Sequence, residues 1–159
     1  MPATPILAVT NDNTFLGMLK SKLSERSNQK GRIAAAPSFD EACLLMKTAR
    51  PRLIVVHLGG DGGQYEQFDR LLWGTSVLSR PTPVVVIAER YLIEQATTLY
   101  RMGVSEYISR THHLDQIGDI LESYLRPLTQ RVTSASNVDG AATRWGAKHV
   151  AASMTAQVV

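Results

Sequence analysis

Hydrophobic and polar positions along the chain follow two different periods. Short runs are apolar at nearly every position, and longer segments have an apolar residue every three or four positions. The short runs predict buried β-strands over residues 6–9, 32–36, 52–58, 83–88 and 105–109. The longer segments predict amphipathic helices over residues 13–26, 38–49, 64–74, 91–103 and 113–125. Each predicted strand is therefore followed by one predicted helix.

Strands and helices that alternate in this way typically build a parallel sheet that is covered by helices on both faces. Two of the strands, 52–58 and 83–88, are apolar on both sides, as the centre of such a sheet requires. The chain has 159 residues, fewer than the roughly 200 that an eight-stranded barrel needs. We therefore expect an α/β fold with a doubly wound, five-stranded, flavodoxin-like sheet in the order 2-1-3-4-5.

The alternation of strands and helices ends near residue 126. We expect residues 1–126 to form the folded domain. Residues 127–159 are rich in Ala, Ser and Thr, with no strand pattern and only a weak helical pattern over residues 139–157. We interpret this segment as a tail that is either flexible or docked through Trp145, on its own domain or on a partner.

Composition argues against several kinds of protein. The formal net charge is +3, without a run of Lys or Arg and without a basic helix face, so we expect no binding of nucleic acid. Because no segment approaches 18 consecutive apolar residues and the N-terminus lacks the features of a signal peptide, we expect no membrane span and a cytoplasmic location. A single cysteine, Cys43, cannot form a disulfide within the chain, and its apolar neighbours predict a small core residue.

Four segments of the chain, in the right order, resemble the receiver domain of bacterial two-component response regulators. The segment ILAVTNDN is similar to the first strand of a receiver, PRLIVVHL to the third, PTPVVVIAE to the fourth, and GVSEYISRT to the fifth strand and its exit. The resemblance covers about residues 5–126. It implies a site where an aspartate after the third strand accepts a phosphoryl group. In the family an acidic pair helps to bind Mg²⁺, and a Thr or Ser and a Lys followed by Pro complete the site.

Every one of these family positions is changed in this sequence. The replacements are His57 for the aspartate, Thr10 and Asn11 for the acidic pair (with Asp12 one place later), Ala88 for the Thr or Ser, Arg110 for the Lys and Thr111 for the Pro. A histidine cannot form an acyl phosphate, and the hard cation Mg²⁺ prefers carboxylate oxygens. We therefore expect a degenerate phosphorylation site that binds no metal and catalyses no reaction.

For the residues that remain at this site, the sequence favours structural roles. We expect His57 to be partly buried and hydrogen-bonded either to a loop carbonyl or to Asp12. We expect Asp12 to cap the helix that follows it. Two other roles stay open at this edge of the sheet: sensing of pH by His57, and binding of an anion by the charge of Arg110.

The resemblance implies an atypical receiver, or pseudo-receiver, which acts without phosphorylation as a signalling module. Its partner would be another protein or a second copy of the chain. In receivers the contact surface is the fourth helix, the fifth strand and the fifth helix, here about residues 90–125. Tyr107 matches the aromatic switch residue of the family. Residue types that are enriched at interfaces also occur in this range, at Arg90, Tyr91, Tyr100 and Arg101.

Two alternatives remain open. The segment LYRMGVSEYI resembles the receiver-like domains of pilus-assembly localisation ATPases of the CpaE/TadZ type, which would make the chain the N-terminal targeting domain of a larger pilus-assembly or transcription-regulatory protein. The chain itself carries no phosphate-binding G-x-x-x-x-G-K-[ST] motif. The alternative of another class is a flavodoxin-like ligand-binding protein. The loop TNDNT lacks the glycine that a flavin phosphate loop favours, and Val55 stands where a cobalamin motif needs an aspartate, so we expect no cofactor.

Overall fold

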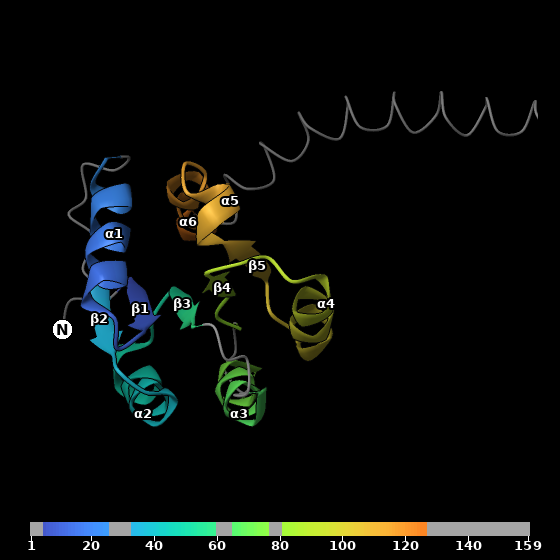
Figure 1. The fold of residues 1–159 in the computed structure, drawn as a ribbon. Helices are drawn as coiled ribbons and strands as arrows, with labels where there is room; N and C mark the ends of the chain where they lie inside the picture. Colours follow the sequence, from blue (N-terminus) through green and yellow to red (C-terminus); the bar gives the residue numbers. More distant parts are fainter. Residues whose placement is uncertain (1–4, 26–32, 60–64, 77–80, 127–159) are drawn as a thin grey trace, which may run out of the picture. The chain divides into compact units, whose positions relative to one another are not determined.

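Five parallel strands form one sheet (Figure 1). The computed structural model describes residues 5–25, 33–59, 65–76 and 81–126. The strands are β1 (Ile6–Val9), β2 (Ile33–Ala36), β3 (Leu53–Leu58), β4 (Val84–Ala88) and β5 (Glu106–Ser109). They lie in the order β2-β1-β3-β4-β5, and each neighbouring pair is parallel. The predicted α/β fold, with a flavodoxin-like sheet in the order 2-1-3-4-5, is therefore confirmed.

Helices cover this sheet on both faces (Figure 1). They are α1 (Asn13–Ser24), α2 (Phe39–Ala49), α3 (Tyr65–Ser76), α4 (Ile93–Met102), α5 (Arg110–His113) and α6 (Ile117–Leu125). Buried side chains of α2, α3 and α4 pack on one face of the sheet, and those of α1 and α6 pack on the other. This two-sided packing is the doubly wound arrangement that the alternating sequence pattern predicts.

The two faces are distinct because successive side chains of a strand point to opposite sides. In β3, Ile54 and Val56 belong to the core beneath α2, α3 and α4, whereas Leu53 and Val55 belong to the core beneath α1 and α6. All four side chains are fully buried, and burial of apolar surface on both faces stabilises the sheet. His57 follows Val55 by two residues, so it lies on the face that α1 and α6 cover.

Three helix ends follow the capping signals of the sequence. The carboxylate of Asp12 accepts hydrogen bonds from the backbone N–H groups of Thr14 and Phe15, at 2.8 and 3.1 Å. The hydroxyl of Ser38 accepts one at the start of α2, at 3.2 Å. Helix α4 ends at Gly103, whose φ of 102° lies in the left-handed region that favours glycine. The predicted capping role of Asp12 is confirmed.

The last predicted helix is interrupted in the structure. The sequence pattern places one helix over residues 113–125, whereas the structure has the single turn α5 and then α6 from Ile117. Ser109 starts α5, because its hydroxyl accepts a hydrogen bond from the backbone N–H of His112 at 3.2 Å. Leu114 continues the apolar spacing of the predicted helix, but it lies between α5 and α6 and is exposed.

Three smaller predictions concern residues outside the sheet. Cys43 is half-buried and packs against the core beneath α2, and burial raises the pKa of its thiol, so its predicted core position is confirmed only in part. The tail over residues 127–159, with Trp145, lies outside the described residues. Within the described ranges, no helix combines the length and the apolar character that crossing a membrane requires.

Candidate functional site

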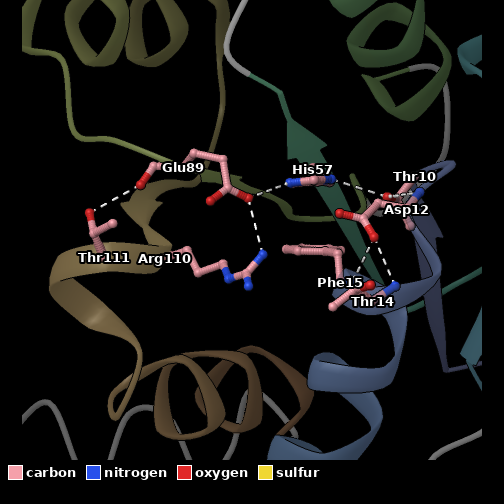
Figure 2. A network of polar contacts seen from close by, with 8 residues as sticks. All are labelled: Thr10, Asp12, Thr14, Phe15, His57, Glu89, Arg110 and Thr111. Atoms are coloured by element: carbon pink, nitrogen blue, oxygen red, sulfur yellow. Dashed lines mark hydrogen bonds and ion pairs between the residues drawn. The ribbon is translucent and has the colours of Figure 1, made fainter.

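Four polar side chains gather at the carboxyl edge of the sheet, on the face that α1 and α6 cover (Figure 2). Thr10 follows β1, His57 lies near the end of β3, Glu89 follows β4 and Arg110 follows β5. The strands are parallel, so their carboxyl ends meet at one edge, and the alternation of side chains points these four residues to the same face. We call this group the polar edge cluster.

His57 lies at the centre of the polar edge cluster. Its Nδ1 is 3.2 Å from Oγ1 of Thr10, and its Nε2 is 3.0 Å from Oε1 of Glu89. Its ring stacks on the ring of Phe15, with the ring centroids 4.0 Å apart and the planes 9° apart. The histidine side chain is only 10% exposed. Both ring nitrogens and one ring face of His57 are therefore in contact with protein groups.

The carboxylate of Glu89 determines which ring nitrogen carries the proton in the neutral histidine. A carboxylate only accepts hydrogen bonds, so Nε2 carries the ring proton and donates it to Oε1 of Glu89. Nδ1 then accepts from the hydroxyl of Thr10, whose oxygen also accepts a hydrogen bond from the backbone N–H of Asp12 at 3.0 Å. This tautomer gives each of these polar groups a partner, as partly buried groups require.

Glu89 connects the ends of three strands. Its Oε1 accepts hydrogen bonds from Nε2 of His57 and from Nη1 of Arg110, the latter at 3.2 Å. Its backbone carbonyl accepts one from the hydroxyl of Thr111 at 3.0 Å. The side chains of Arg110 and Glu89 are 34% and 41% exposed, so solvent screens this ion pair and it contributes roughly 1 kcal/mol or less. The contacts of Glu89 therefore hold these side chains in place relative to one another and add little to the free energy of folding.

The carboxylate of Asp12 is occupied by the cap of α1. The hydrogen bond from the N–H of Phe15 is the main cause that keeps the pKa of Asp12 below its ordinary value, with further contributions from the N–H of Thr14 and the charge of Arg110. The prediction that His57 bonds to a loop carbonyl or to Asp12 is wrong. Its partners are instead a hydroxyl group and a glutamate carboxylate, which satisfy both ring nitrogens.

The residues at this edge do not fit a magnesium site. Mg²⁺ takes octahedral oxygen ligands and is usually bound through carboxylates. Asp12 uses its carboxylate in a helix cap, and Glu89 uses its own on His57 and Arg110. Among the residues that the structure describes, no three or more His, Cys, Asp or Glu side chains form a group that could hold a metal ion.

Two residues of the predicted degenerate site lie apart from the cluster. Ala88 ends β4 and is buried in the core beneath α2, α3 and α4, so it faces away from His57. Asn11 is exposed and lines a mostly polar cavity of about 520 Å³, together with His57 and the start of α2. The structure therefore brings Thr10, His57 and Arg110 together through Glu89, and leaves Ala88 on the opposite face.

Sequence analysis missed Glu89, although the strand pattern contained a signal for it. Ile87 is the partner of His57 in the register between β3 and β4. Glu89 follows Ile87 by two residues, so its side chain leaves the strand on the same face as His57. The comparison with receivers drew attention to Ala88, because the family has a hydroxyl at that position. Alternation and register together would have identified the carboxylate.

Tyr107 is buried in β5, and its hydroxyl contacts the segment before α4. This hydroxyl lies 2.6 Å from Oε1 of Gln95 and 3.2 Å from the carbonyl oxygen of Arg90. It also accepts a hydrogen bond from the backbone N–H of Leu92 at 3.3 Å. Burial raises the pKa of Tyr107, so the hydroxyl keeps its proton and donates it within this group. The ring of Tyr91 packs against the ring of Tyr107, with the two ring centroids 5.1 Å apart.

The segment over residues 90–93 presents large side chains to solvent. Tyr91, Leu92 and Ile93 are 41%, 53% and 77% exposed. They border a groove of about 890 Å³ that Tyr65 of α3 also lines. An exposed apolar group of this kind is typical of a contact surface.

Tyr100 and Arg101 lie on the exposed side of α4. The hydroxyl of Tyr100 donates to Oε1 of Glu106 at 2.9 Å and accepts from the backbone N–H of Tyr107 at 3.1 Å. Burial is the main cause that raises the pKa of Tyr100. Contacts with Tyr107 therefore connect Tyr91 and Tyr100, two of the residues that sequence analysis assigned to the contact surface.

Comparisons with known proteins bear on the fold. No protein-family model matches the chain, and no curated protein matches it in sequence. The structure is similar to that of an orphan response regulator of H. pylori, with 18% identity and a TM-score of 0.61 over 79% of this chain and 100% of that chain. It is similar to a response regulator from Hahella chejuensis, with 12% identity and a TM-score of 0.64 over 77% and 95%. It is also similar to the CheY-like protein TadZ from Pseudomonas aeruginosa, with 16% identity and a TM-score of 0.58 over 75% and 97%. The chain therefore has the fold of response-regulator receiver domains.

Proposed function

We propose that this chain is an atypical receiver domain that acts as a signalling module by binding protein, without being phosphorylated. The observation that carries the proposal is the state of His57, which occupies the position of the phosphoryl-accepting aspartate. Its imidazole is almost buried, and its two nitrogens are bonded to Thr10 and Glu89. The position therefore offers no carboxylate that could form an acyl phosphate.

The charges around His57 support the same proposal. A phosphoryl group needs positive partners, and the cation of this cluster, Arg110, is already paired with Glu89 at 3.2 Å. A phosphoryl group beside Glu89 would also meet a like charge at short range. The donor set does not fit Mg²⁺, which offsets such repulsion in receivers. Signalling by this chain would then depend on its surface and not on transfer of a phosphoryl group.

We place the contact surface on α4, β5 and α6, with the segment 90–93 as its apolar part. This surface is supported by the exposure of Tyr91, Leu92 and Ile93, by the exposed cation Arg90 next to them in sequence, and by the exposed Arg101 in the last turn of α4. Aromatic and arginine side chains are enriched among the residues that dominate binding energy at interfaces. A second copy of the chain is the first partner to test. In this proposal the chain is a binding module and not an enzyme.

The loss of phosphorylation is tested with beryllofluoride, which mimics an acyl phosphate. Amide NMR spectra of the ¹⁵N-labelled full chain are recorded with and without Mg²⁺ and beryllofluoride. We expect no shifts at Thr10, His57, Glu89 or Arg110. A variant with Thr10→Asp, Asn11→Asp and His57→Asp restores the carboxylates and is the matched control, for which shifts are expected. Saturable shifts in the unmodified chain that spread to Tyr107 would contradict the proposal.

The contact surface is tested by sedimentation equilibrium of the full chain. We expect dimers that increase with protein concentration, and we expect Ile93→Asp to weaken them at least tenfold, because a charge would replace a buried apolar contact. Trp73→Asp is the matched control, since Trp73 of α3 is 73% exposed and Ile93 is 77% exposed, on different helices. A strict monomer at high micromolar concentration would exclude self-association, and equal effects of the two variants would place the contact elsewhere.

The second candidate is a targeting domain of a larger pilus-assembly or transcription-regulatory protein. The observation in its favour is the similarity to the structure of the CheY-like protein TadZ. This candidate uses the same surface, so Ile93→Asp would affect it as well. Localisation of a fluorescent fusion in cells separates the two, because a targeting domain would concentrate the fusion at one place and a general interaction module would not.

A further inference from the structure

One oxygen atom of Glu89 receives hydrogen bonds from two converging donors. Nε2 of His57 and Nη1 of Arg110 lie 3.0 and 3.2 Å from Oε1 (Figure 2). Two N–H donors, one of them on a permanent cation, that meet at one oxygen are the arrangement by which proteins bind carboxylates. In this structure the bound carboxylate belongs to the chain itself. The cluster can therefore be read as an anion site together with its ligand.

We propose that His57 and Arg110 form a binding site for a small carboxylate, that Glu89 occupies this site from within the chain, and that its occupancy fixes the segment 90–93. The anion site itself does not depend on the proposed function. Only its biological role rests on that proposal, because the segment 90–93 is the apolar part of the proposed contact surface. The geometry itself is a property of the isolated chain. It can be tested without any partner.

One donor of the site, His57, is held in place without help from Glu89. The ring of His57 stacks on Phe15, and its Nδ1 is bonded to Thr10, so the direction of Nε2 is fixed by two other contacts. Thr10 is in turn held by the backbone N–H of Asp12. A preorganised donor favours the binding of an anion after the tethered carboxylate is removed, and the cationic guanidinium of Arg110 supplies the second donor.

The acceptor side of the site continues directly into the contact surface. The carbonyl oxygen of Arg90, the residue after Glu89, lies 3.2 Å from the hydroxyl of Tyr107. The N–H of Leu92 bonds to the same hydroxyl at 3.3 Å. Leu92 is also the N-cap residue of α4, and its side chain makes no capping hydrogen bond. The start of α4 is therefore held by the hydroxyl of Tyr107 and not by a capping side chain, and Glu89 directly precedes the segment that this hydroxyl contacts.

A free carboxylate would compete poorly with Glu89 in the native chain. A group tethered one residue away from the surface that it holds is present at a high effective concentration. Removal of the Glu89 carboxylate leaves the two donors without an acceptor, and a small carboxylate from solution can then replace it. Such a replacement restores the charge at the site but not the covalent connection to the segment 90–93.

The test is chemical rescue of Glu89→Ala in the full-length ¹⁵N-labelled chain. We expect the variant to shift the ring signals of His57, the guanidinium signal of Arg110 and the amide of Leu92. Acetate, compared with chloride at the same ionic strength, should return the His57 and Arg110 signals towards their native positions in a saturable way. The Leu92 amide should stay displaced, since acetate is not connected to the segment.

Two variants make the result specific. The double variant E89A/R110A removes one donor and should lose at least tenfold in acetate affinity. Glu94→Ala removes a carboxylate from the same region, outside the polar edge cluster, and should leave the His57 ring signals unchanged. If Glu89→Ala does not fold, Glu89→Ser takes its place, because Glu89 is 41% exposed and a small polar residue fits there.

Two results would overturn the proposal. If the Leu92 amide does not move in Glu89→Ala, Glu89 does not position the segment 90–93. If acetate produces no saturable change at His57 and Arg110, the two side chains are not an anion site. Both results would leave the proposed function intact, since that proposal is decided by beryllofluoride and by sedimentation. Failure of the anion-site proposal can therefore be distinguished from failure of the proposed function.

Discussion

The ends of β3 and β4 carry apolar side chains on one face of the sheet and polar side chains on the other. On the face beneath α2, α3 and α4, these strands end in Leu58 and Ala88, which are buried in an apolar core. On the opposite face, the same two strand ends carry His57 and Glu89, which are joined by a hydrogen bond. The apolar and the polar residues are immediate neighbours in the sequence. Because successive side chains of a strand point to opposite faces, a residue that packs in the core is the sequence neighbour of one that belongs to the polar edge cluster.

This difference suggests that the two faces can change independently. The core beneath α2, α3 and α4 (the apolar face) and the core beneath α1 and α6 supply the burial that stabilises the fold, whereas the polar edge cluster is partly exposed and consists of contacts that each contribute little. Substitutions in the polar edge cluster can then change its chemistry without unfolding the domain. Three predictions test this separation, beginning with the largest expected effect.

Phe68→Ala should destabilise the domain strongly and leave the polar edge cluster unchanged. Phe68 of α3 is buried in the core of the apolar face, with its ring edge-to-face against Phe39 at 4.9 Å. Truncation of a buried phenylalanine costs about 3–5 kcal/mol, which urea denaturation would measure. The NMR signals of the His57 ring should keep their positions. Movement of those signals would show that the two faces are coupled.

A matched control for this variant lies on the same helix. Trp73 of α3 is 73% exposed, so Trp73→Ala removes a larger side chain from a position where little of it is buried. The free energy of unfolding should change by roughly 0.5 kcal/mol or less. A loss comparable to that of Phe68→Ala would mean that size, and not burial, determines the effect.

Tyr107→Phe should have an intermediate effect that is confined to the start of α4. The substitution keeps the buried ring but removes the hydroxyl that accepts from the N–H of Leu92 and donates to Gln95. A partly buried N–H without a partner costs about 1–3 kcal/mol. Hydrogen exchange of the Leu92 amide should become faster, while that of amides in β3 follows global stability alone. An unchanged exchange rate at Leu92 would show that other contacts hold this segment.

Asp12→Asn should have the smallest effect, visible mainly in its pH dependence. Asparagine caps a helix about as well as aspartate, so both hydrogen bonds of the cap remain. The pKa of Asp12 is lowered in the folded chain, so its ionised form stabilises the fold at pH values above about 4, the ordinary pKa of an aspartate. This contribution is lost as the pH falls through the lowered pKa.

The thermal midpoints of the native chain and of Asp12→Asn, measured against pH, test this linkage. The native chain should be more stable by a few degrees or less near neutral pH, and the difference should shrink as the solution is acidified. A difference that does not depend on pH would mean that the charge of Asp12 makes no contribution to the folded state.

The sequence predicted the sheet because hydrophobic periodicity and chain order determine it. The cap at Asp12 followed from a local pattern, a polar residue before an apolar stripe, whereas the strand order was predicted as the usual order of a flavodoxin-like sheet. The interruption between α5 and α6 was not predicted, because Leu114 continues the helical spacing while Ser109 starts a separate turn. Propensity and periodicity do not decide between these two signals.

The positions of the site residues were predicted from the sequence, but the residue that links them was not. Thr10, His57 and Arg110 were identified from the resemblance to receivers, and the structure brings them together. The link between them, Glu89, has no counterpart in the family pattern. Its identification requires the register of β3 against β4, a long-range property that a single sequence does not state.

The stacking of Phe15 on His57 gives the chain a built-in reporter. An aromatic ring generates a local magnetic field when its electrons circulate, and protons above its face are shielded. The ring of His57 lies nearly parallel to that of Phe15, at 4.0 Å. Its carbon-bound protons should therefore resonate upfield of those of an ordinary histidine, where they can be told apart from other imidazole signals. Events at the polar edge cluster could thus be followed in the unlabelled protein.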